Sequence, residues 1–387
     1  MFVERIEDNL KQCIIPFWKS MKDEEQGGYY GFMDWEHRID KSYWKGCILN
    51  SRILWFFANA SQALGDATLL PYAEHAFRFL KEHCIDRENG GVYWSVQHDG
   101  GVCDGTKHTY NQAFAIYALS SYYDVSKDEE ALSLAFELYH VIEEKMCDEG
   151  GYGEAFTVDF KPEENDKLSE NNVIADRTMN TLLHICEAYT ELYRVSHDGE
   201  VKERLAWVLN EFVDKVYNPR LHRLEVFFDR DMNSILDLHS YGHDIEATWL
   251  LDRGLTVLGD ETLSNKLAPM IMDLTCQIYS YAYRNHSVMA ECEKGVVDTK
   301  RIWWVQCESI IGFYNAYQKS GNENFKDAAE DIWNYVEEHM LDSCQGSEWF
   351  AEVDERGEVI PHPIVEPWKC PYHNGRMCFE MMRRGRE

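Results

Sequence analysis

The segment ILNSRILWFFANASQAL, residues 48–64, decides the fold of this chain. Its aromatic and small residues are distributed nearly all round a helix, which is typical of a helix that is buried on most sides. Gly65 and Asp66 follow at once, and glycine at that point is a common signal for the end of a helix. A more amphipathic segment, Ala67–His83, comes next. The stretch therefore predicts a buried helix, a tight turn and a second helix.

This two-helix unit recurs along the chain, with short strand-prone pieces between the helices. The unit repeats at a spacing of roughly sixty to seventy residues, which is the length of two helices and their connections. With an N-terminal helix over Ile6–Met21 and a short one after His373, the pattern predicts about twelve helices. The buried ones are Ile48–Leu64, Thr109–Val125, Met179–Val195, Asp244–Leu258 and Ile302–Lys319, and the amphipathic ones include Ala67–His83, Glu129–Lys145, Glu261–Tyr283 and Asn324–Met340.

Two concentric rings of helices satisfy this pattern. The expected fold is all-α, an (α/α)6 barrel of about twelve helices with short β-hairpins in the connecting loops. A linear superhelix of helix pairs is the alternative, but it would expose one face of every buried helix. No linker, low-complexity tract or break in composition interrupts the chain, so we expect a single catalytic domain over residues 1–387.

The composition narrows the class of ligand. The formal net charge of −30 argues against nucleic acid and against an anionic membrane surface, because both attract clustered Lys and Arg. Aromatic residues make up 13% of the chain, and aromatic-rich clefts are where sugar rings stack. A neutral substrate fits this composition best.

The N-terminal stretch MFVERIEDNLKQ is acidic and amphipathic, unlike a signal peptide with its basic and apolar regions. No apolar run approaches the length needed to cross a membrane. The 12 cysteines form no tandem C-x-x-C pairs and are expected to be reduced thiols. We therefore expect a cytoplasmic protein, and a monomer.

Three histidines lie near the starts of, or within, three separate helical segments. They are His184 in NTLLH (180–184), His243 in HSYGHDIE (239–246) and His373 in WKCPYHNGR (368–376). A fold that gathers them gains groups that titrate near neutrality and suit proton transfer at carbon or oxygen. His243 and His373 stand in polar, aromatic stretches that favour a functional role, whereas a structural role for His184 is an equal alternative.

Two carboxylates and one arginine accompany these segments. Glu246 lies three residues after His243 on the same helical face, and Glu308 lies four after Trp304. Each is either an ordinary helical carboxylate or a partner that orients an imidazole and raises its basicity. Arg52 enters an otherwise apolar helix, so it needs a polar or anionic partner, either a developing oxyanion or a structural salt bridge.

Several familiar motifs are missing from the sequence. It contains neither G-x-x-x-x-G-K-[ST] nor a strand-linked G-x-G-x-x-G, so nucleotide cofactors are not expected. It has no H-E-x-x-H motif or Cys/His cluster that would indicate zinc, and no G-x-S-x-G elbow. We therefore expect no metal and no cofactor.

Five segments carry a specific resemblance: NSRILWF (50–56), HTYN (108–111), HSYGHDIEATW (239–249), RIWWVQ (301–306) and WKCPYHNGR (368–376). They resemble those of cellobiose 2-epimerases, which belong to the N-acylglucosamine 2-epimerase superfamily and have the (α/α)6 barrel. The resemblance runs from about Glu4 to Arg384. It implies an isomerase that inverts C2 of the reducing-end glucose of a β-1,4-linked disaccharide without a cofactor. Cellobiose would give glucosyl-mannose, and lactose would give epilactose.

The resemblance also implies the residues of the site, by their positions in these motifs. The catalytic histidines would be the acid/base pair His243 and His373, assisted near the reacting carbons by His184. The residues that hold sugar oxygens would be Arg52, Tyr110 and Asn180, and those that contact the sugar rings would be Trp304 and Trp368. The supporting carboxylates, paired with His243 and His373, would be Glu246 and Glu308.

Other activities stay open at this point. Within the superfamily, they are an aldose–ketose isomerase acting on free mannose or glucose and an N-acylglucosamine 2-epimerase. A glycoside hydrolase on the same barrel would need two carboxylates facing one glycosidic bond, and Glu246 and Glu308 could be that pair. A non-catalytic sugar-binding protein is disfavoured by the three histidines.

Overall fold

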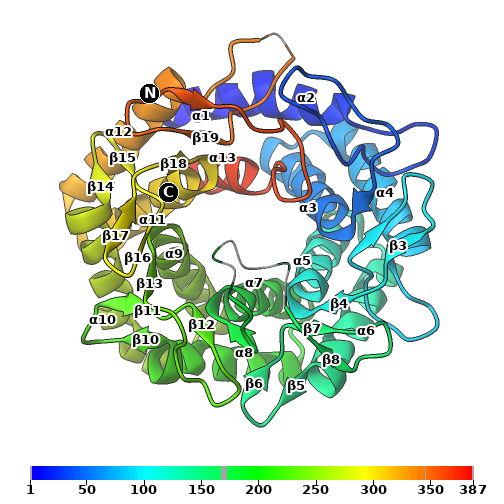
Figure 1. Cartoon of the computed structure of the whole chain (residues 1–387), viewed down its shortest axis with the longest axis horizontal. Coiled ribbons are helices and arrows are strands. Elements are labelled where there is room, and N and C mark those ends of the chain that lie inside the picture. The colour runs from blue at the N-terminus through cyan, green and yellow to red at the C-terminus, as the bar shows by residue number, and fades with distance from the viewer. Residues whose placement is uncertain (1, 166, 168–170, 172, 345, 386–387) are drawn as a thin grey trace.

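Two concentric rings of helices form the molecule (Figure 1). The computed structural model describes residues 2–165, 167, 171, 173–344 and 346–385, and within these ranges the chain forms twelve helices, six in each ring. The inner helices are α3 (Cys47–Leu64), α5 (Thr109–Ser126), α7 (Met179–Ser196), α9 (Tyr241–Leu258), α11 (Trp303–Ser320) and α13 (His373–Arg384).

The outer ring alternates with the inner one along the chain. Its first helix runs from α1 through a π-helical stretch, Leu10–Ile14, into α2. Three later outer helices also continue into π-helical turns, at Leu80–Cys84, Phe212–Val216 and Ile278–Ala282. The outer helices are α1 (Phe2–Asn9) with α2 (Ile15–Ser20), α4 (Leu70–Phe79), α6 (Glu129–Lys145), α8 (Gly199–Glu211), α10 (Glu261–Gln277) and α12 (Glu323–His339).

The inner ring is closed. Each inner helix packs against the next along the chain, and α13 packs against both α11 and α3. The first and last helices of the chain meet, since α1 packs on α13. Arg5 of α1 also donates to Asn334 Oδ1 of the outer helix α12 at 2.8 Å. The predicted (α/α)6 barrel is therefore confirmed, and the linear superhelix is excluded.

The predicted buried helices match α3, α5, α7, α9 and α11 to within three residues at each end. Each of these five helices has 18 residues. Gly65 and Gly259 end α3 and α9 with φ of 63° and 70°, in the left-handed region that glycine enters without steric cost. The glycine stop signal read at Gly65 is therefore correct, and Gly259 acts in the same way.

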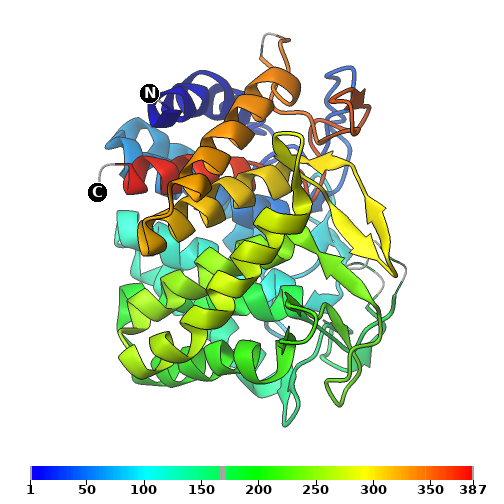
Figure 2. The same cartoon turned by 90° about the vertical axis from the view of Figure 1, so that its left-hand side faces the viewer.

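Short antiparallel strands connect the rings, and Figure 2 shows hairpins gathered at one end of the barrel. A strand directly precedes each of the five 18-residue helices: β1 (Lys45–Gly46), β4 (Lys107–His108), β9 (Arg177–Thr178), β13 (Leu238–Ser240) and β18 (Arg301–Ile302). The remaining strands are β2 (Ser95–Val96), β3 (Val102–Asp104), β5 (Cys147–Asp148), β6 (Gly151–Tyr152), β7 (Ala155–Phe156), β8 (Pro162–Glu163), β10 (Tyr217–Asn218), β11 (Arg223–Leu224), β12 (Phe227–Phe228), β14 (Tyr283–Arg284), β15 (Ser287–Val288), β16 (Glu291–Glu293), β17 (Val296–Asp298), β19 (Glu352–Val353) and β20 (Val359–Ile360). The N-terminal ends of the inner helices thus share one mouth.

Buried side chains at the fourth position of inner helices hold these connections in place. They satisfy backbone groups that burial would otherwise leave unpaired. The backbone N–H groups of Tyr29, Val92 and Val288 donate to Asn50 Oδ1 (3.1 Å), Gln112 Oε1 (2.6 Å) and Gln306 Oε1 (2.8 Å).

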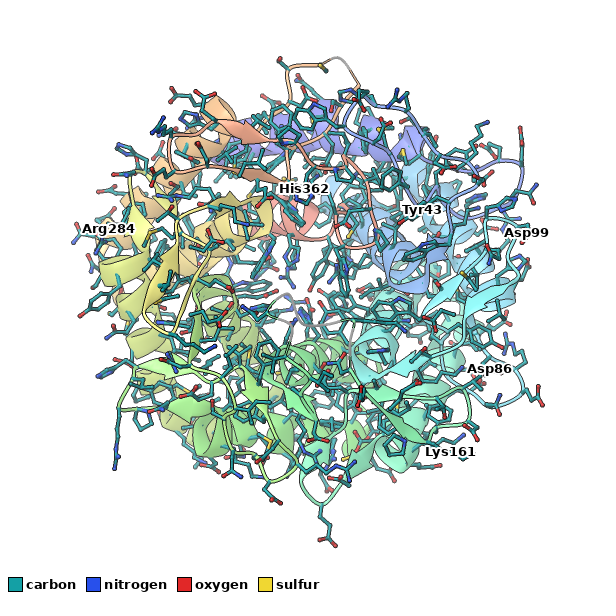
Figure 3. The ribbon with its side chains drawn as sticks, viewed as in Figure 1. Tyr43, Asp86, Asp99, Lys161, Arg284 and His362 are labelled. Carbon is teal, nitrogen blue, oxygen red and sulfur yellow. The ribbon has the colours of Figure 1, made fainter. Side chains whose placement is uncertain are left out.

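Apolar side chains pack between the two rings, and polar ones cover the outside. Figure 3 shows side chains of the inner helices filling the centre, while the labelled Asp99, Lys161 and Arg284 lie exposed at the periphery. None of the helices in the described ranges has the length and apolar character to cross a membrane.

Candidate active site

Equivalent positions on the inner helices carry the predicted site residues. Because the second and sixth residues of a helix are four apart, they share a face. The second positions of α5, α7 and α11 hold Tyr110, Asn180 and Trp304. The sixth positions of α3, α7, α9 and α11 hold Arg52, His184, Glu246 and Glu308.

The three histidines share one hydrogen-bonding pattern. His184 Nδ1 contacts Glu187 Oε2 at 3.0 Å, and His373 Nδ1 contacts Glu308 Oε1 at 2.8 Å. His243 Nδ1 contacts Ser240 Oγ at 2.7 Å. No described residue forms a hydrogen bond with the Nε2 of any of the three rings. Each imidazole is thus held through one nitrogen and leaves the other for a ligand.

The aromatic rings divide the histidines into two groups. Trp304 borders both His243 and His373, with ring centroids 4.8 and 5.5 Å away. His184 instead packs edge-on against Tyr110, with centroids 4.9 Å apart. One group of the site is therefore His243, Trp304 and His373, and the other is Tyr110 with His184.

Burial keeps all three imidazoles neutral. Desolvation lowers the pKa of His243 to about 4 and lowers the pKa of His184. The pKa of His373 also falls well below its usual value, because of burial and then the nearby Arg376 and Arg52 guanidiniums, against the opposing effect of Glu246. At neutral pH each ring can therefore accept a proton.

The two predicted carboxylates behave differently. Glu308 is bonded to His373, as expected, and its Oε2 also accepts from Trp249 Nε1 at 2.9 Å. Glu246 is bonded to Arg376 and not to His243, so its expected pairing is wrong. The spacing does place Glu246 on the face of α9 near His243, but Arg376 reaches it from α13.

Arg376 lies at the centre of a charge network that sequence analysis missed. It is 2% exposed and bonds three carboxylates: Nη1 donates to Glu187 at 2.5 Å, and Nη2 donates to Glu308 at 2.7 Å and to Glu246. Tyr372 completes the network by donating to Glu187 Oε2 at 2.5 Å. One sequence signal could have indicated Glu187, since it follows His184 by three residues as Glu246 follows His243.

Arg52 has neutral partners. Its Nη2 donates to the Tyr110 hydroxyl at 2.9 Å, and its Nη1 lies 3.4 Å from the Trp368 carbonyl. The guanidinium carbon lies 4.1 Å from the centre of the Phe114 ring. Among the described residues, no carboxylate forms a salt bridge with it. Of the two expected roles for Arg52, the structural salt bridge is therefore excluded.

The remaining candidates border the same region. Trp368 is half-buried and packs near Trp94 and Tyr110, with centroids 5.7 and 6.0 Å away. Asn180 Oδ1 has no hydrogen-bond partner among the described residues, so it can accept from a sugar hydroxyl. The structure thus brings all ten predicted residues to the inner helices and the loop before α13, while their roles stay predictions.

One buried group has the spacing of metal ligands. Ligand atoms of Glu246, Glu308 and His373 lie within 4.8 Å of one another. Arg376 Nη2, however, is bonded to both carboxylates. Because a guanidinium already takes the place of a divalent cation between them, these residues do not fit a metal.

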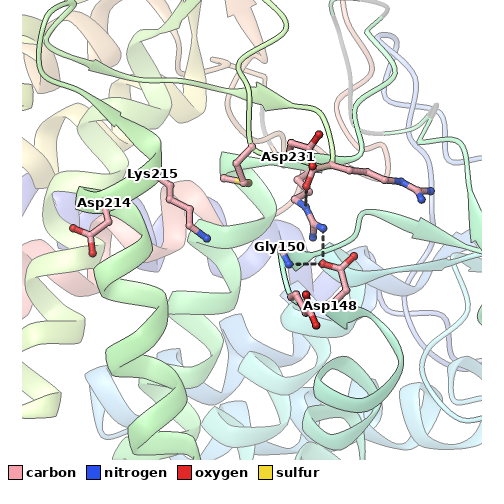
Figure 4. Close-up of a pocket in the computed structure, with 9 residues that line it drawn as sticks. Asp148, Gly150, Asp214, Lys215 and Asp231 are labelled. Atoms are coloured by element: carbon pink, nitrogen blue, oxygen red, sulfur yellow. Dashed lines mark hydrogen bonds and ion pairs between the residues drawn. The ribbon is translucent and has the colours of Figure 1, made fainter.

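A surface cavity of ≈ 840 Å³ lies elsewhere, beside the turn at Asp148 and Gly150 and the π-helical stretch after α8 that holds Asp214 and Lys215 (Figure 4). Asp148 Oδ1 accepts from the Gly150 backbone at 2.8 Å and from Arg177 Nη2 at 2.5 Å. The described residues that line this cavity are a mixture of acidic and basic groups and include no histidine. It has none of the features of the histidine site.

Comparisons with known proteins identify the family of this chain. A sequence model of the family described as N-acylglucosamine 2-epimerase (GlcNAc 2-epimerase) matches residues 27–375. A cellobiose 2-epimerase of Eubacterium cellulosolvens is 48% identical over 400 residues, covering 99% of both chains. One of Ruminococcus albus is 48% identical over 388 residues, covering 100% of this chain and 99% of the relative. The crystal structure of a sugar epimerase from a ruminal bacterium has a TM-score of 0.98 at 47% identity, over 100% of this chain and 99% of that one.

These similarities extend over nearly the whole chain. The family match begins before Arg52 and ends after His373, so it includes all ten predicted site residues. The chain therefore belongs to the N-acylglucosamine 2-epimerase family.

Proposed function

We infer that this protein epimerises C2 of the reducing-end glucose of β-1,4-linked disaccharides. Cellobiose would give glucosyl-mannose, and lactose would give epilactose. The observation that carries the inference is the set of three neutral imidazoles, each held through Nδ1, on the inner ring that also carries Arg52, which forms no salt bridge with the described carboxylates. The similarity to cellobiose 2-epimerases supports the same substrate class. We also propose that residues 1–387 act as one catalytic domain.

The reaction requires proton transfer at carbon. After the sugar ring opens, the C1 aldehyde acidifies the proton on C2. An imidazole of the pair His243 and His373 takes this proton on Nε2, and the electrons of the C–H bond form an enediolate. The negative charge that develops on O1 is stabilised by a fixed donor, and the Arg52 guanidinium, which has only neutral partners among the described residues, can supply it.

Inversion follows from the second imidazole. The other member of the pair has to act as an imidazolium at this stage, in contrast to its neutral form in the protein without substrate. Its Nε2 proton goes to the opposite face of C2, the enediolate electrons form the new C–H bond, and the electrons of the N–H bond return to Nε2. His184 lies beside Tyr110, which bonds Arg52, so it can assist near C1. The product is an isomer of the substrate, so the reaction consumes no co-reactant.

A glycosidase fits this site less well. Hydrolysis needs two carboxyl groups that face one glycosidic bond and act as acid and base or nucleophile. Here Glu246 and Glu308 are both bonded to the same Arg376 nitrogen, and Glu308 also holds His373. Both are therefore engaged in orienting and neutralising other groups.

Incubation with cellobiose, followed by separation of the products, tests the proposed function. We expect glucosyl-mannose as the main product, from enzyme that has been dialysed against excess chelator as well as from untreated enzyme. The physical reason is that imidazoles and a guanidinium suffice for the proton transfers. A product ending in fructose would indicate an aldose–ketose isomerase, free glucose would indicate a hydrolase, and activity that only a divalent ion restores would overturn the proton-transfer mechanism.

Trp368→Ala should reduce epimerisation of disaccharides far more than any residual reaction on free glucose or mannose. Trp368 is half-buried near Tyr110, and we expect it to stack on the non-reducing sugar. Such an aromatic contact is worth ~1 kcal/mol or more, which is a loss of at least about fivefold in kcat/KM. Equal losses on both substrate classes would instead assign Trp368 to packing at the barrel mouth.

A further inference from the structure

Glu187 is a buried carboxylate with three side-chain partners at the site, although no sequence motif assigns it a role. It lies on α7, is 4% exposed, and follows His184 by three residues. Oε2 contacts His184 Nδ1 at 3.0 Å and accepts from the Tyr372 hydroxyl at 2.5 Å, while Oε1 accepts from Arg376 Nη1 at 2.5 Å. These contacts join α7 to α13 through one side chain.

The contact with His184 determines where the imidazole carries its hydrogen. An ionised carboxylate only accepts hydrogen bonds, so the Nδ1 that faces it must be protonated. Burial alone would raise the pKa of Glu187, but Arg376 and the hydrogen bond with His184 bring it down to about 2. Glu187 is thus ionised at neutral pH, and His184 is left with its lone pair on Nε2.

The contact with Tyr372 affects Arg52, the proposed donor to the negative charge on O1. The Tyr372 hydroxyl donates to Glu187, and the face of its ring lies 4.6 Å from the guanidinium carbon of Arg52. The ring therefore forms one wall against the cation, and stacking of this kind limits the orientations of a guanidinium. Because the hydrogen bond holds the hydroxyl in place, it also holds the ring in place. Glu187 therefore limits the orientation of Arg52 indirectly, through Tyr372.

Glu187 and Glu308 are arranged alike around Arg376. Arg376 Nη1 bonds Glu187 and Nη2 bonds Glu308, and each of these carboxylates holds the Nδ1 of one histidine. One guanidinium thus joins two His–Glu pairs. His243 differs, because its Nδ1 faces the neutral Ser240 hydroxyl.

We propose that Glu187 is a positioning residue for the epimerisation: it holds His184 with its hydrogen on Nδ1 and fixes the Tyr372 ring against Arg52. The kinetic part of this proposal rests on the proposed function. The structural part, the position of the hydrogen on His184, is independent of any substrate.

Glu187→Gln tests the kinetic part. The amide can offer either its oxygen or its NH2 to His184, so it no longer determines the tautomer. We expect kcat on cellobiose to fall by about 10² or more, as when an orienting carboxylate is neutralised in other histidine sites, with KM within about threefold of the wild type. Retention of full kcat would overturn the proposal.

Glu191→Gln is the matched control. Glu191 lies one turn further along α7, is 3% exposed, and bonds Arg194 (2.6 Å) and Arg253 (3.3 Å) and no histidine among the described residues. Removing this buried charge should leave kcat within about twofold of the wild type. An equal loss of kcat in both variants would assign Glu187 to packing of α7 only.

The imidazole ¹⁵N spectrum of the protein without substrate tests the structural part. His184, assigned by comparison with His184→Gln, should show the Nδ1–H tautomer in the wild type and in Glu191→Gln, and a mixture in Glu187→Gln. An Nε2–H tautomer in the wild type would overturn the proposal even if Glu187→Gln did not fold. Absence of epimerase activity in the wild type would overturn the proposed function and leave this result standing.

Discussion

Replacement of His243 or His373 by alanine should abolish most of the epimerase activity and leave the barrel folded. Each imidazole is assigned to one face of C2, and loss of a general acid–base group typically costs about 10² to 10⁴ in rate. The fold should survive because each imidazole forms one hydrogen bond with the described residues, and Glu308 keeps its bonds to Arg376 and Trp249. The measurement is kcat on cellobiose, with circular dichroism to follow the fold.

His140→Ala is the control for these two variants. His140 is exposed on the outer helix α6, away from the inner ring. Its loss should leave kcat unchanged. If His243→Ala or His373→Ala instead retained turnover close to that of the wild type, the assignment of that histidine to the acid/base pair would be wrong.

Arg376→Met should destabilise the fold more than any other single substitution at the site. Arg376 is 2% exposed and bonds Glu187, Glu246 and Glu308, which are themselves buried. Removing one partner of a buried ionic group leaves uncompensated charge, at a cost of about 3–5 kcal/mol in the free energy of unfolding. Here three carboxylates lose their common cation. Urea and thermal unfolding would measure the loss.

Two further variants test whether uncompensated charge causes the loss of stability in Arg376→Met. Arg38→Met removes an exposed arginine that pairs with Asp34 on the surface, and the unfolding midpoint should barely change. Glu246→Gln combined with Arg376→Met should recover part of the stability, because one buried charge is removed. If the double variant were less stable than Arg376→Met, packing around the guanidinium would be the main contribution of Arg376.

The site was only partly predictable from the sequence, and the pairings of the carboxylates show why. The same His-x-x-Glu spacing occurs at His184 and at His243. The structure pairs His184 with Glu187, but it pairs His243 with Ser240 and leaves Glu246 to an arginine. Spacing on a helix brings two side chains to one face, but which of them bond depends on the groups that other helices bring there.

The sequence by itself determined the elements and their order. Apolar residues all round a segment require burial on every side, and glycine in the left-handed conformation ends a helix at a defined residue, so the helices from α3 to α11 and the double ring could be derived from local chemistry. Only the tertiary structure decided the partners of Arg376. It lies on the last inner helix, 130 residues after Glu246 and 189 after Glu187, and these side chains meet only because closure of the ring brings α13 beside α11 and α3. Contacts between residues so far apart in the sequence depend on the closed geometry of the barrel, and no local pattern in the sequence encodes them.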